Sequence, residues 1–269
     1  MGSLSDYAEL ELLDHVFNAA YSSVATVYIG LSTADPLDDA SGLAEPVGNN
    51  YAREAITFGA AASRRVTQSG AVTFNLASGP WGTLSHWALF DTDTGGQMLA
   101  HGSLAASKSV VAGNTPSIDT TEVYVEFSAG EISDYCAVKL LDRMFRNQAF
   151  AKPDTYVALI ITNPVADGDD GTEITEPSGG SYARKLVNIN GGAAPDWDLA
   201  ALGVVDNSDD ITFVTATGNW GTIIAVAIVD DPDTSEGQVL FYDNAMADQA
   251  VSSGDTVKFN AGDLDIVMS

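Results

Sequence analysis

The sequence of 269 residues contains a single cysteine, Cys136, so no disulfide bond can form within the chain. Because Cys136 falls among apolar residues at helical spacing, we expect a small buried side chain rather than a reactive thiol. Long apolar runs are also missing. The most apolar run, at residues 223–229, is far shorter than the roughly 20 residues that a membrane-spanning helix needs. We therefore expect no insertion into a membrane.

Basic residues are scarce as well. The chain has 11 lysines and arginines against 37 aspartates and glutamates, which gives a formal net charge of −26. Such a surface repels a phosphate backbone, so we expect no nucleic-acid partner. The acidic residues are dispersed, as in proteins of very salty cells, where a Debye length of about 3 Å at molar salt screens their repulsion. Two origins stay open, a halophilic host and an acidic protein of an ordinary host.

The main feature that the sequence does contain is a tandem duplication of one unit. Three tripeptides return in the same order: Ser5-Asp6-Tyr7 as Ser133-Asp134-Tyr135, Tyr51-Ala52-Arg53 as Tyr182-Ala183-Arg184, and Trp81-Gly82-Thr83 as Trp220-Gly221-Thr222. The offset between the copies grows slowly along the chain, which indicates a duplicated unit with loop insertions. We predict two domains, residues 1–130 and 131–269, each large enough to bury its own core.

Each half is predicted to begin with a helix and to continue with strands. Ser5 and Ser133 are good N-caps, and Leu10, Leu13 and Phe17 follow Ser5 at helical spacing. The strands expected are 26–31, 51–58, 71–76, 83–90 and 122–127 in the first half, and 155–161, 182–189, 211–215, 222–229 and 264–268 in the second. The fold class is therefore mainly β, with two tandem antiparallel β-sandwich or jelly-roll-like domains, each preceded by one N-terminal α-helix.

The repeated polar and aromatic residues are predicted to be structural. They are Tyr51, Arg53, Trp81 and Gly82, with their partners Tyr182, Arg184, Trp220 and Gly221. A recurring arginine in an acidic chain is expected to make a charge-assisted bond to a carboxylate or a carbonyl. Each tryptophan is expected at a sandwich edge, where the following glycine permits close backbone approach. The alternative for these two tryptophans is a platform on which a carbohydrate stacks.

Few residues point to catalysis or to metal binding. His15, His86 and His101 do not recur in the second half and lack metal-ligand spacing, although a Ser-His-Asp site stays open because triads assemble in space. Asp167, Asp169 and Glu173 lie in a loop that superficially resembles a calcium loop, but the closing glutamate of an EF-hand is absent. We expect no catalytic residue and no cofactor, with calcium as the one candidate and a solvated acidic loop as the simpler interpretation.

Four ordered motifs carry a resemblance. They are S-D-Y-x-E-x-x-L-L-D-H-x-F from residue 5, Y-x-G-L-S-T-A-D-P from residue 28, E-P-x-G-x-x-Y-A-R from residue 45 and W-G-T-x-x-H-W-x-L-F-D from residue 81. Together they resemble a family of tailed-phage virion proteins commonly labelled tail fibre proteins. The first half matches nearly throughout, and the second matches more loosely. The resemblance implies a structural role in the virion and no enzymatic activity, and with the acidity it suggests a tailed virus of a haloarchaeal or other halophilic host.

The sequence thus favours a structural protein on the particle surface, either a head decoration or turret or a tail or fibre component. It would act by forming homo-oligomers and by docking to capsid or tail proteins. The alternative is a glycan-binding module for host adsorption, with Trp87 or Trp197 at a loop surface and a host glycan or receptor as its partner. A hydrolase is the weakest hypothesis, because no acid-base constellation recurs between the halves.

Overall fold

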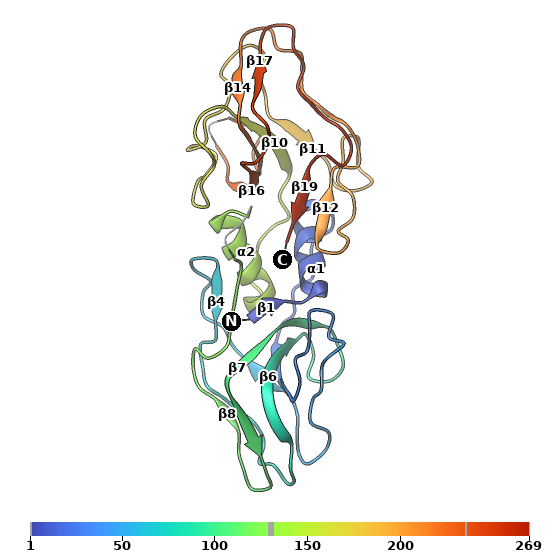
Figure 1. The fold of residues 1–269 in the computed structure, drawn as a ribbon, viewed down its shortest axis with the longest axis vertical. Helices are drawn as coiled ribbons and strands as arrows, with labels where there is room; N and C mark the ends of the chain where they lie inside the picture. The colour runs from blue at the N-terminus through green and yellow to red at the C-terminus, as the bar shows by residue number, and fades with distance from the viewer. Residues whose placement is uncertain (1, 129–131, 235, 269) are drawn as a thin grey trace.

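Two β-lobes lie at opposite ends of an elongated molecule, and two helices lie side by side in the waist between them (Figure 1). This computed structural model describes residues 2–128, 132–234 and 236–268. The first lobe is formed by the strands within residues 27–126 and the second by the strands within residues 155–267. The predicted boundary at residues 129–131 lies outside the described residues, so the division at that point stays a prediction.

The first lobe is built on one seven-stranded sheet, in the order β3-β2-β6-β7-β1-β9-β4. A separate two-stranded ribbon pairs β5 with β8. The strands are β1 (Gly2–Leu4), β2 (Val27–Ser32), β3 (Glu54–Ile56), β4 (Arg65–Thr67), β5 (Val72–Thr73), β6 (Gly82–Phe90), β7 (Met98–Val110), β8 (Ser117–Ile118) and β9 (Tyr124–Glu126).

The second lobe repeats this pattern in shorter pieces. A four-stranded sheet has the order β11-β10-β15-β16, which matches β3-β2-β6-β7, and ribbons pair β12 with β19, β13 with β18 and β14 with β17. The strands are β10 (Thr155–Ile160), β11 (Lys185–Val187), β12 (Val204–Asp206), β13 (Ile211–Thr212), β14 (Gly221–Ile223), β15 (Ala225–Val229), β16 (Val239–Asp243), β17 (Gln249–Val251), β18 (Lys258–Phe259) and β19 (Asp265–Val267).

The predicted fold class is confirmed: the chain is mainly β, with two tandem units of curled sheets and one helix before each. Two details differ from the prediction. The strand β1 was not predicted, and it pairs in parallel with β9 through Gly2 and Val125, whereas the other named strand pairs in the described residues are antiparallel. The apolar run at 222–229 is broken at Ile224, where the first lobe has a register shift between Leu84 and His86.

Both helices form where the caps predict. The helix α1 (Asp6–Phe17) begins after Ser5, whose Oγ accepts a hydrogen bond from Ala8 N at 3.2 Å. The helix α2 (Asp134–Arg146) begins after Ser133, whose Oγ accepts from Cys136 N at 3.1 Å. The buried face of α1 is wider than the predicted stripe, because it includes Leu12 and Val16 while Leu10 is only half-buried. A helix in the waist must contact its partner helix and both lobes, which requires this wider face.

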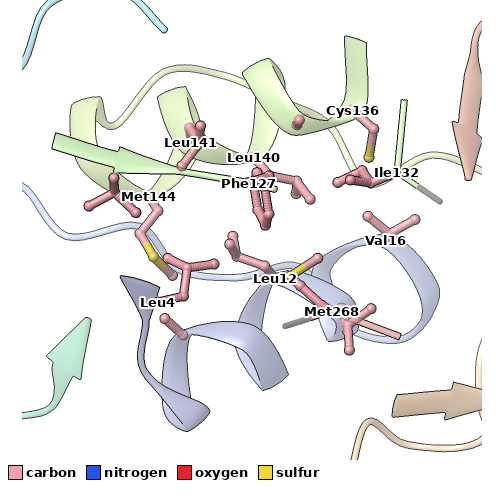
Figure 2. Close-up of a cluster of buried hydrophobic side chains, with 14 of the residues drawn as sticks. Leu4, Leu12, Val16, Phe127, Ile132, Cys136, Leu140, Leu141, Met144 and Met268 are labelled. Atoms are coloured by element: carbon pink, nitrogen blue, oxygen red, sulfur yellow. The ribbon is translucent and has the colours of Figure 1, made fainter. Parts of the chain in front are cut away.

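The waist is packed like the interior of one domain. Leu12 and Val16 of α1 face Cys136 and Leu140 of α2, with Phe127 between the two helices (Figure 2). One cluster of buried hydrophobic residues continues from these helices into both lobes. The Cys136 thiol is fully buried here, and its burial raises its pKa well above the usual range.

Candidate functional site

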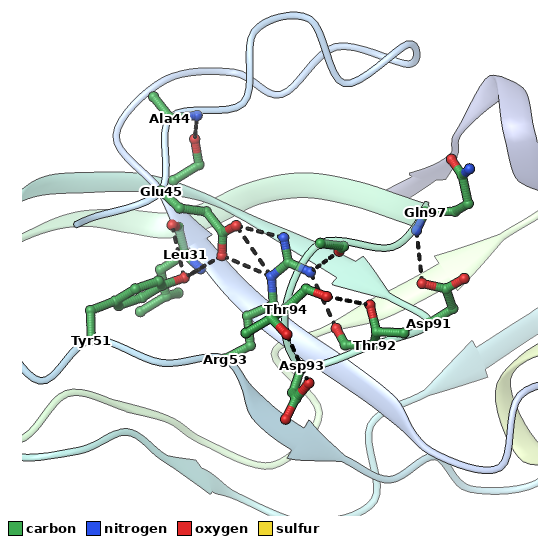
Figure 3. A network of polar contacts seen from close by, with 12 residues as sticks. Leu31, Ala44, Glu45, Tyr51, Arg53, Asp91, Thr92, Asp93, Thr94 and Gln97 are labelled. Atoms are coloured by element: carbon green, nitrogen blue, oxygen red, sulfur yellow. Dashed lines mark hydrogen bonds and ion pairs between the residues drawn. The ribbon is translucent and has the colours of Figure 1, made fainter. Parts of the chain in front are cut away.

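The repeated arginine of the first lobe lies in a network that ties three loops together (Figure 3). Arg53 donates from Nη2 to Glu45 Oε2 at 2.6 Å and from Nη1 to Gly95 O at 2.7 Å. Tyr51 donates its hydroxyl hydrogen to Glu45 Oε1 at 2.7 Å and accepts from Leu31 N at 2.8 Å. The Arg53 guanidinium also lies 3.2 Å from the centroid of the Phe90 ring. A charged pair therefore joins the 45–53 segment to β2 and to the hairpin after β6.

The second lobe contains the same network, more deeply buried. Arg184 donates from Nη2 to Glu176 Oε1 at 2.8 Å, and Tyr182 donates to Glu176 Oε2 at 2.6 Å. Arg184 also donates from Nη1 to the backbone carbonyls of Asp231 and Glu236, at 2.8 and 2.9 Å. The Arg184 and Glu176 side chains are 0% and 2% exposed, against 8% and 19% for the first-lobe pair. The sequence interpretation did not identify the two glutamates as the partners, although each stands in a recurring Glu-Pro pair.

The repeated tryptophans complete these networks on the side away from the waist. Trp81 donates from Nε1 to Asn49 O at 2.9 Å, and Trp220 donates from Nε1 to Gly180 O at 2.9 Å. Each indole meets the neighbouring tyrosine edge-on, with ring centroids 5.2 and 5.3 Å apart. Both rings are buried, so neither offers a face on which a carbohydrate could stack.

The glycine after each tryptophan has a backbone conformation that the sequence pattern did not predict. Gly82 and Gly221 have φ angles of +92° and +91°, a conformation that side chains with a Cβ rarely adopt. A Cβ on Gly82 would also lie 3.3 Å from Thr33 Cγ2, which is a tight contact, whereas one on Gly221 would lie 3.9 Å from Ile161 Cγ2, an ordinary van der Waals distance. The positive φ therefore requires glycine at the start of both β6 and β14, and at Gly82 the close approach of Thr33 adds to this requirement.

The two tryptophans considered for glycan contact are also buried. Trp87 on β6 points into the core of the first lobe, and Trp197 is fully enclosed and donates from Nε1 to Thr155 Oγ1 at 2.9 Å. The expectation that they lie at a loop surface is wrong. The Trp197 ring instead packs on Phe17 of α1, with centroids 4.8 Å apart. Both tryptophans therefore contribute to packing, Trp197 at the junction of waist and second lobe.

The acidic loop of the second lobe uses its carboxylates to hold its own backbone. Asp169 accepts from Ala166 N at 2.7 Å, and Glu173 accepts from Asp170 N at 3.2 Å. Asp167 accepts from the Tyr242 hydroxyl and lies 3.2 Å from Arg64 Nη1. Across the described residues, no group of three or more His, Cys, Asp or Glu side chains could hold a metal ion. The resemblance to a calcium loop is thus not matched by converging ligands.

Two histidines lie near a serine and an aspartate, but neither has the geometry of a catalytic triad. His86 Nδ1 lies 2.8 Å from Ser85 Oγ, but Asp35 Oδ2 is 3.9 Å from His86 Nε2, too distant for a hydrogen bond. His101 Nε2 lies 2.8 Å from Asp38 Oδ1 and 3.3 Å from Ser3 Oγ, whereas the serine and aspartate of a triad contact opposite ring nitrogens. Asp35, at 3.6 Å from His101 Nδ1, is too distant for a hydrogen bond. His15 lies in the waist, where burial lowers its pKa and its Nε2 lies 3.0 Å from Phe150 O.

Reciprocal hydrogen bonds cross the waist. Asp142 of α2 accepts from Ala61 N in the first lobe at 2.8 Å. Asp14, at the matching position of α1, accepts from Ala200 N in the second lobe at 3.0 Å. Ala61 and Ala200 are themselves matching positions, just before the turns that lead into β4 and β12. Each helix therefore accepts a hydrogen bond from the lobe of the other unit, and these matching contacts relate the two units by approximate two-fold symmetry.

One arginine breaks this symmetry. Arg64, in the turn before β4, donates to Ile132 O at 2.7 Å and to Ser128 O at 2.6 Å, on either side of the junction between the units. It has a φ of +63°, which is strained for a residue with a Cβ, and these bonds hold it there. The matching residue of the second lobe is Gly203, whose turn lies beside Glu9.

Because Gly203 stands where the first lobe has Arg64, its turn places no arginine beside Glu9. Burial, together with the neighbouring carboxylates of Asp38 and Asp6, raises the pKa of the Glu9 carboxyl to about 7. At the waist, Asp134 and Asp167 lie 3.6 and 3.2 Å from Arg64 Nη1, which compensates their negative charge. Among the described residues, the negative charge of the matching pair, Asp6 and Asp38, has no such arginine beside it.

The ends of the lobes are built alike. The first tip comprises residues 46–50, 75–81 and 111–116, joined by Ser78 N to Asn49 O and Gly113 N to Ala77 O. The second tip comprises residues 177–181, 214–220 and 252–257, joined by the two matching bonds. In both lobes these loops lie at the end away from the waist, where β6 begins and β7 ends, or β14 begins and β17 ends (Figure 1).

Comparison with known proteins identifies both units. The family described as Podophage GP4 fiber I protein gp80 matches the chain twice, over residues 3–126 and over residues 131–267. No curated protein matches the chain. Among the described helices, none is long and apolar enough to cross a membrane.

Proposed function

Because the chain belongs to the Podophage GP4 fiber I protein gp80 family, it is a structural, virion-associated protein of the tailed-phage fibre type, and we propose that it stands on the particle surface as a rigid two-lobed connector. In this role it assembles with copies of itself and docks to capsid or tail proteins. The sites available to it are a head decoration or turret and a tail or fibre position.

The observation that carries this proposal is the packing of the waist. A connector must transmit position from one end to the other, and lobes joined by a loose linker would swing independently. Here the helices share one hydrophobic cluster with both lobes, and each helix accepts a backbone bond from the lobe of the other unit. The lobes are thereby held at fixed positions relative to each other.

Cross-linking of intact particles tests the proposal. Purified virions treated with a carboxylate-reactive cross-linker suit this Asp-rich chain, and mass spectrometry would identify the neighbours. We expect cross-links between copies of this chain and to at least one capsid or tail protein. The proposal fails if the chain is present in virions only at contaminant level, or if it is cross-linked to no virion protein.

The acidity supports a halophilic host as part of the same proposal. At a net charge of −26, self-repulsion opposes folding in dilute buffer and is screened at high salt. We expect the midpoint of thermal unfolding to rise steeply between 0.1 and 3 M KCl. A midpoint that changes no more than that of an ordinary acidic protein would contradict this origin.

A glycan-binding module for host adsorption is the second candidate, and the second tip favours it. That tip carries exposed hydroxyl and amide side chains, Ser178, Thr215, Asn219 and Ser252 among them, which are suited to hydrogen-bonding sugars. A glycan array probed with the full chain would support this candidate if Asn219→Ala abolished binding. An array without signal would remove it.

A further inference from the structure

The two tips share a backbone but differ in chemistry. At five exposed positions the first tip is apolar where the second is polar: Val47 against Ser178, Leu76 against Thr215, Pro80 against Asn219, Val111 against Ser252 and Ala112 against Ser253. Val47, Leu76 and Val111 are 92%, 57% and 53% exposed. One substitution runs the other way, Asn75 against the exposed Val214. The second tip demonstrates that this backbone does not need the apolar residues for folding.

The first tip also lacks charge. Residues 46–50, 75–81 and 111–116 include no Asp, Glu, Lys or Arg, in a chain with 48 such residues. Exposed apolar residues that cluster in this way mark a surface for protein contact rather than a random scatter. The hydrogen bonds from Ser78 N to Asn49 O at 3.1 Å and from Trp81 N to Val110 O at 3.0 Å fix the loops, so the surface is preformed.

The charge of the rest of the chain indicates which partner fits. A partner with a basic surface would gain most by binding the acidic flanks, and it would gain nothing from a neutral tip. A second copy of this chain faces the opposite situation, since contact between two acidic flanks would bring like charges together. For two copies, a neutral apolar end is the place where contact is least opposed.

We propose that two copies of this chain associate through their first tips, end to end. This inference rests on the self-assembly proposed above and assigns it a surface. A contact between the same patch on both copies is isologous, so it closes as a dimer and leaves both second tips outward. The patch is small, so the association is expected to be weak and to strengthen at molar salt, where repulsion between the chains is screened.

Analytical ultracentrifugation of the full chain, at 0.1 M and 3 M KCl over a range of concentrations, tests the proposal. The variant Val47→Ser/Leu76→Thr/Val111→Ser places on the first tip the residues that the second tip already carries. We expect the wild type to dimerise at 3 M KCl and the triple variant to dimerise at least tenfold more weakly. The matched control is Val214→Asn, which removes an exposed apolar residue from the second tip and should leave the dimer constant unchanged.

Each outcome bears on the proposal. A wild type that stays monomeric at both salt concentrations overturns it, and so does a triple variant that dimerises as well as the wild type. Equal weakening by Val214→Asn would also overturn it, because the contact would then not be confined to the first tip. The virion cross-links are a separate result: a monomeric chain that is cross-linked to capsid or tail proteins refutes the tip contact and leaves the proposed function standing.

Discussion

Replacing Phe17 with alanine tests whether the waist joins the two lobes into one cooperative unit. Phe17 belongs to the first unit, but its ring lies 4.8 Å from the Trp197 ring and 5.4 Å from the Phe241 ring, both in the second unit. It is fully buried. The substitution would leave a cavity at the junction of waist and second lobe, with a cost of about 4 kcal/mol.

The expected shift in melting temperature follows from the size of the chain. Unfolding entropy of about 2.1 cal/mol/K per residue, over 269 residues, gives roughly 560 cal/mol/K if the whole chain unfolds together. A loss of about 4 kcal/mol then lowers the midpoint by about 7 °C. Phe145→Ala, at the matching position of α2 and 5.4 Å from the Phe58 ring, should have a similar effect.

Differential scanning calorimetry with hydrogen exchange measures both parts of this prediction. We expect one transition that moves as a whole, and faster exchange in β6 of the first lobe as well as in β15 of the second. Leu202→Ser, at an exposed turn position, is the control and should leave the midpoint within about 1 °C. Two separate transitions, with Phe17→Ala moving only one, would refute the reasoning.

Further predictions concern single groups. Arg184→Met leaves the Glu176 carboxylate buried without its partner and should cost 3–5 kcal/mol in urea unfolding, roughly, while Arg53→Met at the more exposed pair should cost less. Because the folded pKa of Glu9 is raised from 4.5 to about 7, the folded chain holds this proton more tightly than the unfolded chain, and stability should fall as pH rises through that window. Glu9→Gln should flatten the fall when unfolding is measured from pH 4 to 8, and an unchanged slope would contradict the assignment. Cys136 should react with a thiol reagent only at the rate of unfolding, and rapid labelling of the native chain would show that the waist is open.

Local features of the fold could be predicted because they are encoded in adjacent residues. Ser5 and Ser133 cap helices through bonds to a residue three positions later, and the duplication locates the strands by comparing two samples of one design. The alternation around Val125 likewise gives a strand with one buried face. These features need no knowledge of distant segments.

Long-range pairing could not be predicted in the same way. The strand β1 has three residues, too few for a period, and it forms because β7 and β9 leave a place between them. The bonds from Ala61 N to Asp142 and from Ala200 N to Asp14 join residues more than eighty positions apart. A sequence pattern places both aspartates on helices but does not say which lobe they contact.

For the site residues too, neighbouring sequence predicts the kind of interaction, and only the fold shows which distant residue takes part. An arginine that recurs in both halves of an acidic chain predicts a carboxylate partner, but the sequence offers many carboxylates, and only the fold shows that Glu45 is the one beside Arg53. Trp197, flanked by Asp196 and Asp198, has the local context of a surface residue. In an extended segment alternate side chains point to opposite sides, so acidic neighbours on the wet side are compatible with a fully buried indole.

The reciprocal waist has a consequence for how such a chain can change over generations. A single unit could satisfy its helix only by pairing with a second, identical unit, and that pair would carry the same tip at both ends. Once the two units are joined in one chain, a mutation alters one end alone. At the waist the two aspartates that bond across it, Asp14 and Asp142, are the same in both units, while at the tips Val47 and Ser178 can come to contact different neighbours. Covalent linkage of the two units thus permits the two ends of a nearly symmetric molecule to become different from each other.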